Sequence, residues 1–182
     1  MSTAETAKMV RVALREAFPG VKFSVRSSVY AGGSSINVSW VDGPNGAMVD
    51  RVAGTFSGAY FDGQLDYKGA TKAMIDGVVV QFGADFIFTQ RKCTLAFMQA
   101  AKAAAVRKYG ALVAGVAVLE SGGGAYFDSS DYDGFRLANE VANRRTAYIC
   151  PRRSRTAERV IYLGNDGYSE CGALQVEGVC GE

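Results

Sequence analysis

The sequence contains no histidine, although the chain has 182 residues. Histidine is the side chain most often used as a general base near neutral pH, and it completes the Ser-His-Asp and Cys-His pairs of nucleophilic enzymes. Those mechanisms are therefore excluded within this chain. Only carboxylate, lysine, cysteine or tyrosine chemistry is left, and no constellation of these residues is recognisable as catalytic. We expect a protein that is not an enzyme and that needs no cofactor.

Cysteine is scarce as well. The sequence has four cysteines, widely spaced and without a CxxC pair: Cys93, Cys150, Cys171 and Cys180. Structural zinc sites usually combine closely spaced pairs of cysteine and histidine ligands, so we expect no metal site. In a reducing cytosol the four thiols are expected to be free.

Long apolar runs are absent too. The N-terminal segment lacks the continuous apolar core of a signal peptide, and no segment approaches the ~20 apolar residues that span a bilayer. We therefore expect a soluble, cytoplasmic protein with no membrane partner.

Neither sign of charge dominates the chain. It has 20 Lys and Arg against 18 Asp and Glu, for a formal net charge of +2. This balance argues against both an acidic surface that mimics DNA and a wholly basic nucleic-acid binder. A charged partner would therefore have to bind to a local patch of charge on the protein surface.

What the sequence does contain is a clear strand pattern between Pro19 and Pro44. Two runs there alternate apolar and polar residues, the apolar ones being Phe23 and Val25, then Ile36, Val38 and Trp40. Such alternation predicts two strands with one buried face. Residues 27–33 between them are expected to form a loop too long for a two-residue turn, in which the paired glycines can take positive φ.

Helical patterns flank this predicted hairpin. Ser2 or Thr3 can cap a first helix that ends near Phe18, and Glu5 follows Ser2 at the spacing of a capping box. A second helix is expected from about Asn45 to residue 56. The start of the chain is thus interpreted as helix, hairpin, helix, and we predict an α+β fold in which helices cover an antiparallel sheet.

Further elements are predicted downstream. A third helix follows the cap Thr94, runs to Tyr109 and stops at Gly110, and a fourth covers residues 135–145. Strands are expected at residues 64–68, 78–82, 82–89, 112–120, 146–150, 159–163 and 171–176. We expect 112–120 to be buried and 159–163 to pair with 171–176 across a turn. We assign residues 1–120 to one α+β domain and residues 121–182 to a C-terminal α/β extension packed on it.

Three stretches of the sequence carry a family resemblance. The run from Val10 to Pro44, followed by YFDG at residues 60–63 and FGADFIF at residues 82–88, resembles a large polyvalent protein-associated domain. The resemblance extends to about Arg91. It implies an α+β domain with an antiparallel sheet, found in proteins encoded by phages, plasmids and other mobile elements that protect incoming DNA or disarm host defences. It assigns no catalytic residues.

The strongest charge cluster lies in the last third of the chain. It comprises Arg144, Arg145, Arg152, Arg153, Arg155 and Arg159, with Tyr148 among them. Arginine binds phosphate or carboxylate with two parallel hydrogen bonds, and an aromatic ring beside it can stack on a base. These residues could form a surface for a polyanion or an acidic partner. Alternatively they are ordinary solvated arginines, neutralised by the later acids Asp166, Glu170, Glu177 and Glu182.

A second candidate contact lies at the predicted hairpin loop. Arg26 and Tyr30 stand beside it, and tyrosine and arginine are enriched at protein interfaces. The glycines there do not predict phosphate binding, because a strand rather than a helix follows them. Residues 129–140 partly match a calcium loop, but Asp131 or Asp133 more simply caps the following helix.

Our leading hypothesis is a non-enzymatic counter-defence protein of a phage or plasmid. It would act in the host cytoplasm by binding and inhibiting a defence protein or ribonucleoprotein, such as a CRISPR effector or a restriction system. Its partner-binding residues would be Arg144, Arg145, Tyr148, Arg152, Arg153, Arg155, Arg26 and Tyr30. The alternative is a nucleic-acid-binding accessory protein that accompanies transferred DNA.

Overall fold

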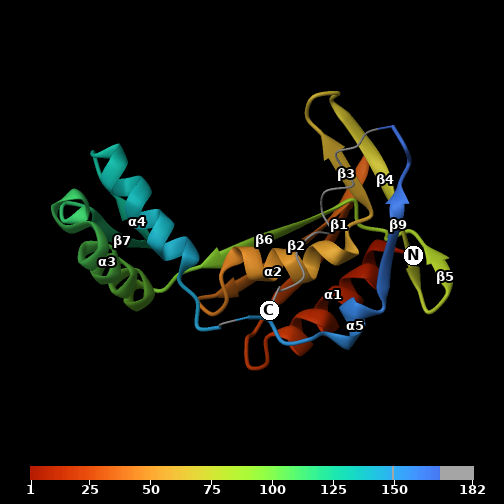
Figure 1. The fold of residues 1–182 in the computed structure, drawn as a ribbon, viewed down its shortest axis with the longest axis horizontal. Coiled ribbons are helices and arrows are strands. Elements are labelled where there is room, and N and C mark those ends of the chain that lie inside the picture. The colour runs from red at the N-terminus through yellow and green to blue at the C-terminus, as the bar shows by residue number, and fades with distance from the viewer. Residues whose placement is uncertain (149, 169–182) are drawn as a thin grey trace. The chain divides into compact units, whose positions relative to one another are not determined.

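The structure, a computed structural model, describes residues 1–148 and 150–168. Its contacts divide the chain into two compact units, which are described one at a time. Unit 1 comprises residues 1–38, 50–89 and the described residues from Arg152 onward, and unit 2 comprises residues 39–49 and 90–151. Figure 1 shows the elements of both units.

Helix α1 (Thr3–Ala17) opens unit 1 with the predicted capping box at Ser2. The Ser2 hydroxyl accepts a hydrogen bond from the Glu5 amide, and the Glu5 carboxylate accepts one from the Ser2 amide at 2.7 Å. The inner side of α1 is fully buried at Val10, Ala13 and Leu14. Apolar residues repeated every three or four positions fall on one side of a helix, which is why this segment folds as an amphipathic helix. The predicted first helix is confirmed.

A three-stranded sheet follows, with the strand order β1-β2-β6. Its strands are β1 (Ser24–Tyr30), β2 (Gly33–Val41) and β6 (Phe86–Lys92). Val25, Ile36 and Val38 are buried, as their alternation predicts. The expected long loop is wrong, because only Ala31 and Gly32 separate β1 from β2. The polar residues after Val25 continue an exposed edge strand, and Gly32 reverses the chain with φ 88°.

The second sheet of unit 1 is antiparallel and is centred on β4 (Tyr67–Ile75). Strand β4 pairs with β3 (Ala59–Asp62), β5 (Val78–Val80) and β9 (Val160–Asn165). Gly69 lies opposite Tyr60, and a Cβ atom on it would stand 2.3 Å from the tyrosine ring. A glycine is therefore needed where β3 and β4 approach. Strand β9 adds the end of the described chain to this sheet.

The remaining helices of the N-terminal half are short. Helix α2 (Gly46–Ala53) begins after Asn45, whose side-chain oxygen accepts from the Met48 amide at 2.9 Å, and η1 (Gly54–Phe56) continues it. Phe56 is fully buried in unit 1, and its ring meets Phe82 edge-on at 5.5 Å between centroids. The second helix therefore lies where the sequence predicted it.

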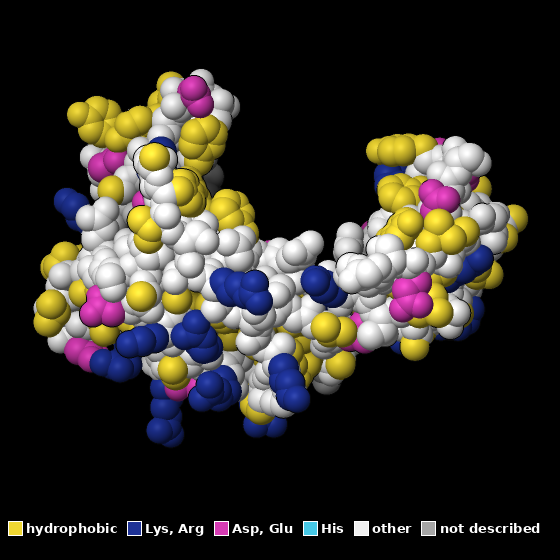
Figure 2. Space-filling view, turned by 180° about the vertical axis from the view of Figure 1, so that it is seen from behind, with side chains coloured by type: hydrophobic (Ala, Val, Ile, Leu, Met, Phe, Trp, Pro, Cys, Tyr) yellow, Lys and Arg dark blue, Asp and Glu magenta, His cyan; other side chains and the backbone are white. Residues whose placement is uncertain are grey.

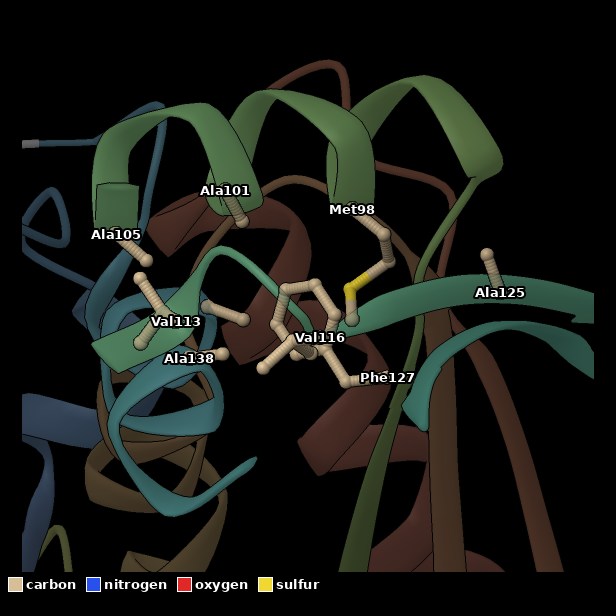
Figure 3. Close-up of a cluster of buried hydrophobic side chains, with 9 residues drawn as sticks. Met98, Ala101, Ala105, Val113, Val116, Ala125, Phe127 and Ala138 are labelled. Atoms are coloured by element: carbon tan, nitrogen blue, oxygen red, sulfur yellow. The ribbon is translucent and has the colours of Figure 1, made fainter. Parts of the chain in front are cut away.

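Unit 2 is built mainly from two helices and a two-stranded ribbon. They are α3 (Leu95–Tyr109), the 3₁₀ turn η2 (Gly110–Val113), β7 (Ala117–Ser121), β8 (Gly124–Asp128) and α4 (Tyr132–Arg144). Thr94 caps α3 and Asp131 caps α4 through their side chains, as predicted. In Figure 3, Met98, Ala101 and Ala105 of α3 face the buried side chains of Val113, Val116 and Phe127. Small alanines thus form much of this core.

Several predicted strands differ from the structure. Residues 112–120 are not a buried strand: η2 takes the first part, and β7 is mostly exposed. Strand β6 begins only at Phe86; Phe82 and Ala84 precede it in buried loop positions, and Phe88 is exposed. No strand forms among the described residues of 146–150. Residues 160–163 of the predicted strand 159–163 do lie in β9, whereas its predicted partner 171–176 lies outside the described residues.

The fold class is α+β, as predicted, with helices and antiparallel sheets. The chain order α1, β1, β2, α2 begins it, and β1 and β2 are neighbours in the first sheet. Nothing among the described helices has the length and apolar character needed to cross a bilayer. The division into domains at residue 120 stays a prediction, because a unit defined by contacts is not yet a unit that folds alone.

Candidate cationic interface

The outer side of α1 carries a row of cations. Lys8, Arg11 and Arg15 are all exposed, and their spacing of three and four residues places them on one side of the helix. The apolar residues of α1 determine this arrangement, because burying Val10, Ala13 and Leu14 on one side of the helix leaves the cations on the opposite side exposed. The row therefore follows from the amphipathic pattern that folds the helix.

The C-terminal part of unit 1 places more arginines at the end of α1. The Arg152 amide donates to the Ala17 carbonyl at 2.9 Å, and helix α5 (Arg155–Glu158) begins three residues later. Arg152, Arg153 and Arg155 are all exposed. The predicted arginine segment thus lies beside the last turn of α1.

Glu16 holds the two segments together. Its carboxylate accepts bonds from the Ser154 hydroxyl at 2.7 Å, the Thr156 amide at 3.0 Å and the Thr156 hydroxyl at 3.1 Å. Partial burial opposes ionisation of this carboxyl, but the three donors outweigh it and lower the pKa of Glu16. The Glu16 carboxylate therefore interacts mainly with these donors, which belong to and directly follow the arginine segment, residues 152–155.

Strand β1 places Arg26 and Tyr30 at the surface of unit 1. The Arg11 guanidinium donates to the Val25 carbonyl at 2.8 Å. Arg26 follows the buried Val25, and because successive side chains of a strand point to opposite faces, Arg26 lies on the other face of β1 from Val25. Tyr30 lies at the end of β1 and is 51% exposed. We call five exposed cations of α1 and the arginine segment, none of which has an ion pair to a described acid, the cationic face: Lys8, Arg11, Arg15, Arg152 and Arg155.

Other arginines near this face are paired. Arg153 lies 3.3 Å from the Glu158 carboxylate, although its side chain is 93% exposed. The Arg159 guanidinium donates to both oxygens of Asp76, one of them at 2.9 Å, and the pKa of Asp76 is lowered by this bond. Arg159 therefore joins the start of β9 to the β4–β5 turn.

The two remaining arginines of the predicted cluster belong to unit 2. Arg144 lies 3.6 Å from the Glu140 carboxylate one turn earlier in α4. The Arg145 guanidinium stands 5.7 Å from the centroid of the Phe97 ring. Tyr148 is half-buried, and its amide donates to the Thr146 hydroxyl at 3.1 Å. The predicted cluster is thus divided between the units, and within unit 1 Arg152, Arg153 and Arg155 lie beside the end of α1.

The later acids were expected to compete for these arginines. Asp166 is otherwise engaged: it accepts from the Tyr60 and Tyr67 hydroxyls at 2.7 and 2.8 Å and from the Ala70 amide at 2.9 Å. The bond from Tyr60 is the largest cause that lowers the pKa of Asp166 to about 2. Glu170, Glu177 and Glu182 lie outside the described residues.

Metal-ligating groups do not gather in the described part of the chain. Asp131 of the partial calcium loop accepts from the Asp133 and Gly134 amides, as the cap of α4. Among the cysteines, Cys93 and Cys150 are free thiols, whereas Cys171 and Cys180 lie outside the described residues.

Figure 2 shows one face of the molecule on which Lys and Arg side chains gather with few acids among them. The contribution of α1 to such a surface was not predicted from the sequence. Lys8, Arg11 and Arg15 lie on the polar side of the predicted first helix. Their helical spacing, combined with the absence of acids at those positions, was the signal that could have identified them.

Comparison with known protein families finds a match. Residues 1–96, more than half of the sequence, match the family described as Large polyvalent protein associated domain 29. The chain belongs to this family, which confirms the resemblance drawn from its sequence and associates it with mobile genetic elements. The matched residues include α1, the first sheet and all of the cationic face except Arg152 and Arg155. Among curated proteins and solved structures, nothing matches the chain.

Proposed function

We propose that this protein binds a host defence complex, such as a CRISPR effector or a restriction system, and inhibits it by occupying a binding surface. The family association with mobile elements supports the biological setting. The observation that carries the proposal is the cationic face, where exposed arginines have no ion pair to a described acid and the neighbouring Glu16 carboxylate is hydrogen-bonded to Ser154 and Thr156. Arginine is enriched at binding hot spots, and clustered charge accelerates association with an oppositely charged partner.

In this proposal the cationic face recognises an acidic surface or a phosphate backbone within the defence complex. Arg152 and Arg155, together with Arg15, supply forked donors. Tyr30 is the aromatic contact on the same unit. The inhibitor works by steric exclusion and needs no catalysis, so no cleavage of the partner or of nucleic acid is expected.

The same cations favour one alternative, a nucleic-acid-binding accessory protein that accompanies transferred DNA. Plain duplex would then bind through its phosphates, and the affinity would fall steeply as salt concentration rises. The inhibitor hypothesis differs because it requires a specific protein or ribonucleoprotein partner.

The test compares one double charge reversal with a matched control. Arg15→Glu with Arg152→Glu reverses two members of the cationic face, while Lys72→Glu with Arg107→Glu reverses two exposed cations elsewhere. The full chain and both variants are used to capture partners from host lysate, followed by mass spectrometry, and each is titrated with duplex DNA at several salt concentrations. Circular dichroism checks that each variant is folded.

We expect the native chain and the control variant to capture the same defence complex, and the cationic-face variant to lose at least about 10-fold in affinity for it. A purified complex should also lose activity when the native chain is added. Tight, salt-sensitive binding to plain duplex with no captured complex would favour the accessory protein. Cleavage of DNA with magnesium, abolished by a chelator, would refute the non-enzymatic proposal.

A further inference from the structure

Unit 2 contains a cavity of about 250 Å³ that the proposed interface does not use. It lies between the end of β6, the β7–β8 ribbon, α3 and α4, with Met98 and Ala125 contributing to its apolar lining. Ligand pockets typically measure roughly 300–1,000 Å³, so this cavity lies just below the usual range and has room for a small molecule but not for a peptide.

The charged lining of this cavity has one sign. Arg91 and Lys92 line it at the end of β6, and no Asp or Glu is among the lining residues. The neutral polar lining includes three carboxamides, Gln90, Asn139 and Asn143. Carboxamides both donate and accept hydrogen bonds, whereas the two cations offer donors alone. The combination is suited to an anion that also carries neutral polar groups.

Arg91 is fixed in place by unit 2 itself. Its guanidinium donates to the Arg145 carbonyl at 2.7 Å and to the Ala142 carbonyl at 2.6 Å, and it lies 4.9 Å from the centroid of the Phe97 ring. Bonds to carbonyls do not neutralise its charge. Arg91 therefore contributes a fixed positive potential, while the Lys92 ammonium, exposed and unpaired among the described residues, is available to a ligand.

The ribbon is held close to β6 at this point. The Ala125 amide donates to the Cys93 carbonyl at 2.8 Å, and a Cβ atom on Gly124 would lie 3.0 Å from that carbonyl. At the neighbouring Gly123, by contrast, a Cβ atom would meet nothing nearer than 4.0 Å. Gly124 thus packs against β6, whereas Gly123 borders open space in the lining.

We propose that this cavity binds a small organic phosphate, with its phosphate group bound by Lys92 in the positive potential of Arg91. A phosphate monoester carries up to two negative charges, which matches two cations in a lining that contains no acid. Asp42 lies near Cys93, but its carboxylate accepts from the Thr94 amide and hydroxyl. The carboxamides bind the polar remainder of the molecule. Tyr126, which lines the cavity and is 47% exposed, offers a ring face for an aromatic group.

Adenosine monophosphate is the probe, with inorganic phosphate and adenosine as comparisons. Nuclear magnetic resonance titration of the full chain should show saturable shifts at the amides of Gly123, Gly124 and Asn143 with the monophosphate. Inorganic phosphate should shift the same amides more weakly, and adenosine should shift them least, because it lacks the charge.

Two variants and one control locate the binding. Lys92→Ala removes the available ammonium and should weaken binding of the monophosphate at least about 10-fold. Gly123→Val places a side chain in the open space and should abolish binding without straining the backbone. Lys102→Ala neutralises a cation of α3 outside the lining and should leave binding unchanged.

A second readout uses the thiol that lines the cavity. Cys93 is half-buried, and burial raises the pKa of its thiol, so it should react slowly with iodoacetamide. In a Cys150→Ser, Cys171→Ser, Cys180→Ser variant, adenosine monophosphate should slow this reaction further. The proposal is overturned if the monophosphate causes no saturable shift, if adenosine binds equally well, or if Lys92→Ala and Gly123→Val leave binding intact.

Discussion

At the scale of single residues, Asp166 organises one end of the second sheet. Its two carboxylate oxygens accept from Tyr60 of β3, Tyr67 of β4 and the Ala70 amide of β4. Since Asp166 directly follows β9, one charge joins three strands of the sheet. The same contacts raise the pKa of the Tyr67 phenol, because its hydrogen bond to Asp166 favours the protonated form.

The pH dependence of this contact has a definite sign. The pKa of Asp166 is lowered from its ordinary value of 3.8 to about 2, so the ionised carboxyl stabilises the folded protein. That contribution is complete above the ordinary pKa and is lost as the pH falls through about 2. We expect Asp166→Asn to lower the melting temperature at pH 7, and its difference from the native chain to shrink between pH 4 and pH 2.

Thermal unfolding followed by circular dichroism at several pH values measures this difference. Asp66→Asn is the matched control, because Asp66 is exposed in a turn with φ 48°, a conformation that asparagine tolerates. A pH-independent effect of Asp166→Asn, or an equal effect of both variants, would contradict the assigned role.

At the scale of elements, α1 serves both the core and the candidate interface. Its buried side contains Val10 and Leu14, and its exposed side contains Lys8, Arg11 and Arg15. Changes on the two sides should therefore have separable effects.

Leu14→Ala and Val12→Ala test this separation. Leu14 is fully buried, so its truncation should lower the free energy of unfolding by about 2–5 kcal/mol through lost transfer energy and a cavity. Val12 is 42% exposed on the same helix, so its truncation should change stability by less than about 0.5 kcal/mol. Urea unfolding measures both, and similar losses would show that α1 is packed differently.

Local signals explain which elements could be predicted. The capping box at Ser2, the cap Thr94 and the cap Asp131 each depend on residues within three positions. The first and third helices start as expected, whereas α4 begins at Tyr132, three residues before the predicted start. The strands that were predicted wrongly depend on contacts with residues far away in the sequence. Nothing local in residues 82–85 reveals their contacts, such as the bonds from the Asp85 amide to the Ser34 carbonyl and from the Thr3 hydroxyl to the Gly83 carbonyl.

The candidate site was predictable only in part, for the same reason. The arginine segment at 152–155 was visible as composition, but its position at the end of α1 depends on Glu16, more than a hundred residues away. The pocket lined by Lys92 could not be anticipated, because four separate segments form it.

At the scale of the whole molecule, the two units have cores of different composition. Five of the nine buried residues in the unit 2 cluster are alanines: Ala101, Ala105, Ala125, Ala138 and Ala142. Unit 1 instead buries larger side chains, including Phe18, Phe56 and Leu14. Each buried methylene contributes about 0.8 kcal/mol, so alanine contributes less than leucine or phenylalanine.

Hydrogen exchange should detect this difference. We expect the amides of α3 and α4 to exchange faster than those of α1, because unit 2 has less apolar area to lose when it opens. Mass spectrometry of exchanged peptides from the full chain measures the rates. Equal protection of the three helices would show that the chain opens as one cooperative body.

The interleaved path of the chain has a consequence for synthesis. The central strand β4 emerges from the ribosome long before β9, which occupies one of its edges. At about 5–20 residues per second, translation from the end of β4 to the end of β9 takes on the order of 5–20 seconds. Throughout that interval the nascent polypeptide presents an open hydrogen-bonding ladder, so the sheet can be completed only after β9 has been synthesised.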